Sequence, residues 1–473
     1  RAIRLKLRFR HTAYPLAIRG GFDSDDDTLN AVYRICVRTQ QVCALDSYVD
    51  TPWREQAQWW GDARVQAQNT FHLSGDTRLL VRGIRQIATQ EVPNGLTFGH
   101  APTIAYNCIL PDFSIIWALT IWDYYFQTAD VSLFVEQWPR IRHLLGYFTG
   151  EGRGANGLLK YDPRYWLFLD WCDIHKEGTP TLLNLWYLLM LEKLTAMASA
   201  AKMPAERKEL AAMCDRHKRS VSAKLWDAGE GLFRDGLRPN GSPVNVHSIH
   251  TQTLAIMCGL KSGHHATMVR KRLLPYLKGR KVAGAQPSSY WVTYVYSVMR
   301  LLGYGREVLE HIRRGWAPMI PFGGTWEQFT GRIGYSTTSH AWAAHPIYHL
   351  VGTLGGVTQT EVAWRRVRFE DVVREEGRKR TGIEDWFALT PQERHRVAVE
   401  VLQLGGEIVE GAEDFEVTKA VFEKLIEPTL IQPTFVTHVL KEFIPLAKVS
   451  PEDPDTVEVF ECCANGQELA PAY

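Results

Sequence analysis

Residues 25–354 repeat one pattern, an apolar helix followed by a short loop rich in Gly, Pro or Asp and by another helix. Within the first helix, Leu29, Val32, Ile35 and Cys36 recur at helical spacing. Because short loops connect the helices, neighbours in sequence are expected to pair as hairpins. The pattern predicts helices at residues 28–45, 62–74, 79–88, 112–127, 131–148, 181–201, 204–226, 250–258, 265–277, 287–302, 306–315 and 336–350.

This series predicts a mainly α fold, an (α/α)6 toroid in which inner and outer helices alternate and the loops at one rim carry the site. Strand signals are few, with short extended pieces expected at residues 158–161, 231–234 and 322–327. We find no sequence repeat of fixed period, which disfavours the common solenoids.

The expected division of the chain has three parts. Residues 1–22 are interpreted as the remnant of an upstream segment, because the chain starts at Arg1 without a methionine or a signal sequence. Residues 23–357 form the predicted barrel. Residues 358–473 are dense in charge and are predicted to be a mostly helical unit of unassigned role, with a capped helix start at Thr390 to Glu393.

Composition excludes several classes of partner. The net charge of +2 favours neither nucleic acid nor an anionic membrane surface, and no apolar run is long enough to span a bilayer. The eight cysteines form no disulfide framework and favour a reducing compartment, although both a cytoplasmic and an exported location stay open, as does the oligomeric state. The histidines and cysteines form no set at ligand spacing, so we expect no metal and no cofactor.

The sequence from 50 to 63, DTPWREQAQWWGDA, concentrates acids and indoles. Paired carboxylates catalyse glycoside hydrolysis, and an indole offers a flat apolar face with a polar N–H. An amphipathic helix start with Asp50 as N-cap is the structural alternative. The acids are Asp50, Glu55 and Asp62, the indoles are Trp53, Trp59 and Trp60, and the arginine is Arg54.

Similar chemistry recurs downstream. A Gly-Gly pair precedes Trp326 and Glu327, and His340 lies in a Ser-His-Ala-Trp segment soon afterwards. The pair Asp170-Trp171 follows an apolar run between these two regions. Each segment alone also fits an ordinary loop, so their combination and order carry the argument.

Together these segments resemble the catalytic domain of bacterial α-L-rhamnosidases, glycoside hydrolase family 78, from Phe22 to Gly352. The resemblance implies removal of terminal α-L-rhamnose with inversion, with Glu55 as general acid and Glu327 as general base. A rhamnose-containing oligosaccharide or glycoside is then the expected substrate. The residues implied to bind it are Asp50, Arg54, Trp60, Asp62, Asp170, Trp171, Trp326 and His340, with the indoles as apolar walls. Family members usually carry flanking β-sandwich domains, from which the charged helical tail departs.

The acid role sets electrostatic expectations. Glu55 must stay protonated near neutral pH, which requires burial or nearby negative charge, and Asp50 and Asp62 are expected to supply that charge. We therefore expect Arg54 to pair with one of these aspartates and not with Glu55. Two alternatives stay open, another (α/α)6 glycosidase of the debranching or trehalase type, and a sugar-binding protein of the same fold without catalysis.

Overall fold

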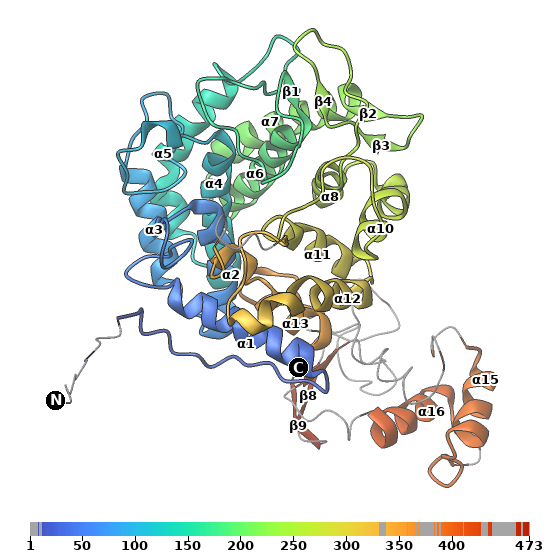
Figure 1. Ribbon diagram of the computed structural model, residues 1–473. Helices are drawn as coiled ribbons and strands as arrows, with labels where there is room; N and C mark the ends of the chain where they lie inside the picture. The colour runs from blue at the N-terminus through green and yellow to red at the C-terminus, as the bar shows by residue number, and fades with distance from the viewer. Residues whose placement is uncertain are drawn as a thin grey trace, which may run out of the picture. The chain divides into compact units, whose positions relative to one another are not determined.

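A computed structural model describes residues 8, 12–330, 337–356, 358–364, 367–368, 383, 386, 389–409, 411–426, 434–437, 460–464 and 467–472. The chain divides into two compact units, Arg1–Thr353 and Leu354–Tyr473. The first unit contains a ring of paired helices (Figure 1). The helices are α1 (Asp27–Val42), α2 (Trp60–Leu73), α3 (Arg78–Thr89), α4 (Pro111–Thr128), α5 (Ser132–Thr149), α6 (Thr181–Ala200), α7 (Pro204–Lys224), α8 (Ile249–Met257), α9 (His265–Met268), α10 (Leu274–Leu277), α11 (Val292–Leu301), α12 (Gly305–Trp316) and α13 (Pro346–Leu354).

Two of the inner helices, α4 and α6, are largely apolar and buried on all sides. In α4 every residue from Pro111 to Ile121 is buried, and in α6 every residue from Thr181 to Leu191. A helix that is apolar all round must be covered on every face. The covering comes from neighbouring inner helices, which pack in the order α2, α4, α6, α8 and α11, and from α3, α5, α7 and α12 outside them. The mainly α toroid predicted from the sequence is confirmed.

Local signals account for several helix ends. The Asp26 carboxylate accepts a hydrogen bond from the Leu29 amide at 2.9 Å and caps α1. Proline occupies the first position of α4 and α7, where no backbone N–H is needed. Gly75 follows α2 with a φ of +72°, so it serves as the left-handed residue expected there.

Three predicted elements are wrong. The helix expected at 287–302 begins only at Val292, and the helix expected at 336–350 begins only at Pro346. Instead of a regular helix, residues 337–345 form loop backbone with a single 3-10 turn at Ala341–Ala343. The extended piece expected at 322–327 follows another 3-10 turn, Ala317–Phe322, whose prolines disfavour a strand. These corrections matter because residues 323–330 and 337–345 form loop segments that reach the candidate site.

Two pairs of short strands accompany the ring of helices in the described part of the first unit. β1 (Thr179–Pro180) pairs with β4 (Gly236–Leu237), and β2 (Trp226–Asp227) pairs with β3 (Leu232–Phe233), both antiparallel. Among the described helices, none has the length and apolar character that crossing a bilayer requires.

The second unit combines short helices with strands. β5 (Thr358–Gln359) pairs with β6 (Val367–Arg368), and α15 (Pro391–Arg396) and α16 (Asp414–Val421) each run into a π-helical turn. The capping box expected at Thr390 and Glu393 is present. An antiparallel sheet of β7 (Thr434–Thr437), β8 (Phe460–Ala464) and β9 (Gln467–Ala472) was not predicted. Ala398, Leu404, Val417 and Val421 give the unit an apolar core of its own.

Candidate active site

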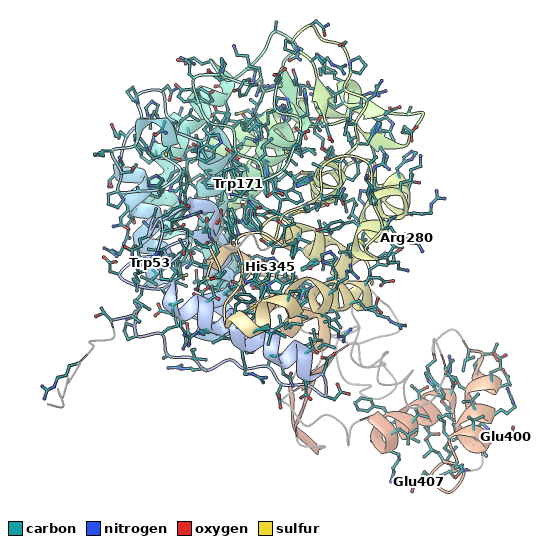
Figure 2. The ribbon with its side chains drawn as sticks, viewed as in Figure 1. Trp53, Trp171, Arg280, His345, Glu400 and Glu407 are labelled. Carbon is teal, nitrogen blue, oxygen red and sulfur yellow. The ribbon has the colours of Figure 1, made fainter. Side chains whose placement is uncertain are left out.

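The first half of the site is the loop between α1 and α2. The buried Asp50 carboxylate accepts the Ala57 amide at 2.9 Å, and the Asp50 amide donates to the Ala57 carbonyl at 3.0 Å. This closure pushes the residues between them outward, and Gln56 adopts a φ of +51°. Trp53 is 88% exposed as a result (Figure 2). The loop therefore presents Arg54 and Glu55 on a tightly closed base.

The second half is the loop that precedes α13. Two of its described parts pair with each other, because the Glu327 amide donates to the Thr337 carbonyl at 3.0 Å and the His340 amide donates to the Thr325 carbonyl at 2.8 Å. Gly324 allows this close approach, since a Cβ there would lie 2.7 Å from the Thr338 carbonyl oxygen. The Gly-Tyr-Ser segment at 334–336 lies outside the described residues.

Arg54 joins the two loops. Its Nη2 atom donates to Glu327 Oε2 at 3.0 Å and to Glu55 Oε1 at 3.3 Å. The expectation that Arg54 pairs with Asp50 or Asp62 rather than with Glu55 is therefore wrong. Since both bonds end at the same nitrogen, Glu55 Oε1 and Glu327 Oε2 cannot lie farther apart than the two bond lengths added together. This upper limit falls just short of the ~6.5–9.5 Å between the carboxyls of inverting glycosidases. Arg54 thus lies between two carboxylates that it holds closer together than an inverting pair.

Glu55 is less enclosed than its acid role led us to expect. Its carboxylate is 37% exposed, and it accepts the Trp59 indole N–H at 2.7 Å. The expected burial is therefore absent from this arrangement, in which Glu55 is held by hydrogen bonds. The Trp59 ring is in turn fixed edge-on by Trp166 and Phe113, with ring centroids 5.9 and 6.1 Å away.

Trp60 does not line the site. It is fully buried in the core, where its indole N–H donates to the Thr120 hydroxyl at 3.1 Å. The adjacent Trp59, at the N-cap of α2, is the indole that reaches Glu55. Successive residues at a helix start point in different directions, so the double tryptophan contributes one ring to the site and the other to the core.

Two aspartates and a histidine form a buried charged cluster. His340 Nε2 lies 3.0 Å from Asp62 Oδ1, and both side chains are almost fully buried. Burial, followed by the charge of Asp62, raises the pKa of Asp50 to about 7. Burial likewise raises the pKa of Asp62, against the opposing effect of His340. Burial alone would lower the pKa of His340, but the hydrogen bond and charge of Asp62 raise it above its usual value.

Asp50 also retains an unsatisfied oxygen. Its Oδ2 atom is buried and has no hydrogen-bond partner among the described residues. Buried polar atoms in folded proteins are nearly always paired, so an unpaired one marks a place where a ligand hydroxyl can donate. This atom belongs to the same buried cluster as Asp62 and His340, and His340 contacts Glu327 through Thr337.

Asp170 is held differently from the other acids. It accepts the Ser288 amide at 2.9 Å, the Trp171 amide at 2.8 Å and His250 at 2.8 Å, and the Ser288 hydroxyl as well. These bonds occupy both oxygens, so Asp170 anchors the loop and presents Trp171. Trp171 is 47% exposed and packs on Phe168 at 5.1 Å (Figure 2).

An aromatic path connects Trp171 to the charged cluster. Phe168 stacks on Trp342 at 6.2 Å, and the His340 ring lies 4.3 Å from Trp342. Trp326, in contrast, is buried edge-on against Phe322, with only 8% of its surface exposed. Trp171 is therefore the better candidate for an exposed apolar wall, and Trp342 is a neighbour that the sequence did not single out.

One group of metal-ligand side chains lies within the described residues, Asp170, Cys172 and His250, whose ligand atoms lie within 4.8 Å of one another. The 2.8 Å separation of Asp170 and His250 is that of a hydrogen bond, and Cys172 lies 3.7 Å from each. Hydrogen bonding accounts for this group.

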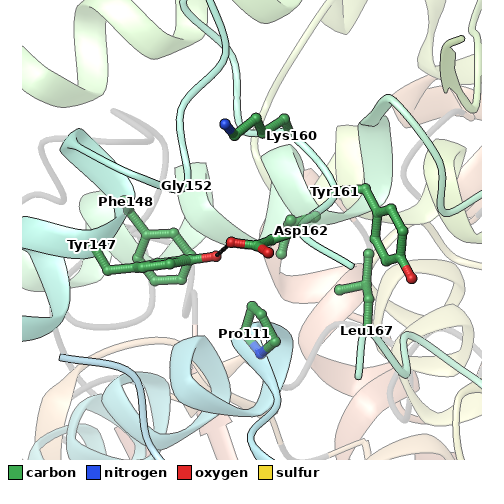
Figure 3. A pocket seen from close by; sticks show the side chains of 9 residues that line it. Pro111, Tyr147, Phe148, Gly152, Lys160, Tyr161, Asp162 and Leu167 are labelled. Carbon is green, nitrogen blue, oxygen red and sulfur yellow. Dashed lines mark hydrogen bonds between the residues drawn. The ribbon is translucent and has the colours of Figure 1, made fainter. Parts of the chain in front are cut away.

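A separate small pocket lies beside α4 and α5. Tyr147 and Asp162 face one another across it, with the tyrosine hydroxyl donating to the carboxylate at 3.3 Å (Figure 3). Its cavity volume of about 10 Å³ has room for one water molecule. The pocket is too small for a sugar and contains none of the expected site residues.

Comparisons with known proteins fit this arrangement. The family described as the bacterial alpha-L-rhamnosidase 6 hairpin glycosidase domain matches residues 18–354. A family 78 rhamnosidase of Bacillus sp. GL1 is 27% identical with a TM-score of 0.68, over 75% of this chain and 38% of that one. A rhamnosidase from Klebsiella oxytoca, solved with rhamnose bound, is 19% identical with a TM-score of 0.60, over 73% of this chain and 66% of that one, and this likeness shows the fold alone.

Curated proteins of another kind match a shorter part. The lysine–tRNA ligase of Mycoplasma genitalium is 52% identical over 52 residues, which is 11% of each protein. That of Staphylococcus saprophyticus is 35% identical over 113 residues, 24% of this chain and 21% of the ligase. The chain thus spans between a tenth and a quarter of the length of these curated relatives.

Proposed function

The chain belongs to the family of bacterial α-L-rhamnosidase six-hairpin glycosidases, and from that premise we propose that it hydrolyses the bond to a terminal α-L-rhamnose with inversion. The main support for the proposal is that Glu55 and Glu327, which are 272 positions apart in sequence, both bind the same nitrogen atom of Arg54. An inverting mechanism needs an acid and a base on opposite faces of the sugar, so Arg54 must shift and the two carboxylates must separate as the sugar and the attacking water enter.

The roles of the two glutamates follow from the direction of proton transfer. Glu55 gives its proton to the glycosidic oxygen as the bond to the anomeric carbon breaks. Water attacks that carbon from the opposite face and gives its proton to Glu327. Arg54 must leave its position between the carboxylates as the sugar enters, and its guanidinium can then donate to a rhamnose hydroxyl.

The remaining residues bind the sugar. The unpaired Oδ2 atom of Asp50 accepts a hydrogen bond from a rhamnose hydroxyl, and Asp62 and His340 are further polar groups for the sugar hydroxyls. Trp171 supplies an exposed apolar face for the C6 methyl group. The substrate is a glycoside or oligosaccharide that ends in rhamnose.

A panel of p-nitrophenyl glycosides tests the proposal. The purified protein is expected to release p-nitrophenol from the α-L-rhamnopyranoside and not from the α-D-glucopyranoside. Release from the glucoside alone would replace the proposal with a glucosidase of the same fold. Binding of rhamnose in a calorimetric titration, without hydrolysis, would replace it with a sugar-binding protein.

We also propose that the lysine–tRNA ligase-like segment is the second unit, Leu354–Tyr473. The glycosidase family match ends at residue 354, where the two compact units divide. The matches to the Staphylococcus saprophyticus and Carboxydothermus hydrogenoformans ligases span 113 and 110 residues, lengths that the second unit can accommodate. Since they cover only 21% of each ligase, we assign no ligase activity to the unit and no part in glycoside hydrolysis.

A further inference from the structure

A continuous set of contacts runs from Asp62 to Glu327. His340 Nε2 lies 3.0 Å from Asp62 Oδ1, and His340 Nδ1 lies 2.8 Å from the Thr337 hydroxyl. That hydroxyl lies 3.3 Å from Glu327 Oε2, to which the Thr337 amide also donates at 3.0 Å. Thr337 is neither among the site residues predicted from the sequence nor among the groups that act in the proposed reaction.

With Asp62 and Glu327 both ionised, one assignment of protons satisfies every contact in this set. The Thr337 hydroxyl has one hydrogen, and the carboxylate can only accept, so that hydrogen points to Glu327. The hydroxyl must then accept from His340 Nδ1, and the other proton must sit on His340 Nε2, which faces Asp62 at the ion-pair distance of 3.0 Å. A neutral imidazole carries one N–H, so both contacts are made only when His340 is an imidazolium. The upward shift of the His340 pKa, which Asp62 causes, agrees with this assignment.

The charges around the set alternate in sign. Asp62 lies against His340 Nε2, the charges of Asp62 and Asp50 both raise the pKa of the ring, and Glu327 lies beyond Thr337, which contacts Nδ1. Arg54 approaches Glu327 from the α1–α2 loop, and Glu55 lies on the far side of Arg54. The ring of Trp342, 4.3 Å from His340, closes the remaining side. His340 is thus a buried cation between Asp62 and Glu327.

We propose that Thr337 and His340 are positioning residues for Glu327, and this inference rests on the proposed role of Glu327 as general base. The imidazolium orients the Thr337 hydroxyl, and the hydroxyl holds Glu327 Oε2. The contacts from Arg54 and from Thr337 converge on Oε2, so Oε1 is the oxygen that takes the proton from water. When Arg54 moves aside for the sugar, Thr337 and His340 keep the carboxylate oriented.

Steady-state kinetics of two Thr337 variants test the role of the hydroxyl. Thr337→Val keeps the shape and the amide donor but loses the hydroxyl, whereas Thr337→Ser keeps both donors. Since a hydrogen bond to a charged group is lost, we expect Thr337→Val to lower kcat about 10- to 100-fold with KM within about twofold, and Thr337→Ser to stay within about threefold of wild type. The matched control is Thr338→Val, an exposed neighbour, which leaves both constants unchanged. Equal kcat in wild type and Thr337→Val would overturn the proposal.

A double-mutant cycle separates positioning from general structural damage. In a Glu327→Gln background, Thr337→Val should have no further effect on kcat, because the base through which Thr337 acts is gone. The same fold-loss in both backgrounds would show that Thr337 acts elsewhere and would refute the proposal.

Nitrogen NMR of the histidine rings gives a readout that needs no turnover. At neutral pH the His340 signal, assigned by its absence from His340→Gln, should be that of an imidazolium with both nitrogens protonated. A neutral ring would overturn the proposal even if the enzyme hydrolyses rhamnosides. An imidazolium in a protein without rhamnosidase activity would refute the proposed function and leave the proton assignment standing.

Discussion

Loss of His340 should destabilise the first unit, by an amount that follows from the burial of the His340 and Asp62 side chains. Asp62 and His340 are both almost fully buried and lie 3.0 Å apart, so His340→Gln leaves the aspartate with no cation beside it. Breaking a buried ion pair by removing one partner costs about 3–5 kcal/mol. Because glutamine can still donate one hydrogen bond to Asp62, we expect the lower end, about 3 kcal/mol.

Differential scanning calorimetry measures this loss as a change in Tm. The first unit has the length of Arg1–Thr353, which corresponds to an unfolding entropy of about 0.7 kcal/mol per degree. The expected decrease in Tm of the barrel transition is therefore about 4 °C. The loss should also depend on pH. Since the folded pKa of His340 is raised above 6.5, its stabilisation is complete below that pH and is lost as the pH rises through the folded pKa.

His217→Gln is the matched control. His217 is equally buried, but its described partner is the Asn184 carbonyl at 3.1 Å rather than an acid, and its pKa is lowered to about 4 by burial. Because that pKa is lowered, the effect of losing His217 should have the opposite pH dependence and grow as the pH rises from about 4 through 6.5. In the double variant Asp62→Asn/His340→Gln, stability should recover, because no buried charge remains unpaired. An unchanged Tm in His340→Gln, or no recovery in the double variant, would refute the buried ion pair.

Three further outcomes are expected. Trp59→Phe removes the 2.7 Å hydrogen bond to the part-exposed Glu55 and should lower kcat/KM about fivefold, whereas an unchanged value would mean that the bond plays no part in turnover. Burial and Asp62 raise the pKa of Asp50 to about 7, so the contribution of Asp50 to stability is complete below about pH 4 and is lost between about pH 4 and 7. This fall in stability is at most about 4 kcal/mol. Urea titrations at pH 5 and pH 8 should show a smaller fall for Asp50→Asn than for wild type. Removal of residues 358–473 should leave kcat/KM for the aryl rhamnoside within about twofold, and a larger loss would give the second unit a part in hydrolysis.

The fold was largely predictable because its signal is periodic. The continuous apolar runs of α4 and α6, and the proline at the start of α4 and α7, identify these helices without tertiary information. The start of α13 carries the same proline signal at Pro346, which the prediction of a helix over 336–350 passed over. Residues 337–345 adopt a loop that makes contacts with distant residues. One such contact is the bond from the Ala341 amide to the Asp50 carbonyl at 2.8 Å.

The sequence was enough to propose the acids of the site but not to identify their partners. The motif at residues 50–63 identified Glu55 and Arg54, but the contact of Arg54 with Glu327 depends on two loops that meet only in the fold. Thr337 carried no signal, because a threonine in a loop resembles any other polar residue. Trp60 rather than Trp59 was predicted to bind the sugar because composition does not show which of two adjacent rings faces the core. The position at which α2 begins determines that the Trp60 ring faces the core.

Proton NMR of the sugar released from p-nitrophenyl α-L-rhamnopyranoside tests the central claim most directly, with wild type, Glu55→Gln and Glu327→Gln run side by side. Glu55 and Glu327 as an inverting pair predict that β-L-rhamnose appears first and that Glu327→Gln loses about 100- to 10,000-fold in kcat. They also predict a smaller loss in Glu55→Gln, since p-nitrophenolate departs with little need for a proton. Release of α-L-rhamnose first, or full activity in Glu327→Gln, would contradict the assignment of these two carboxylates.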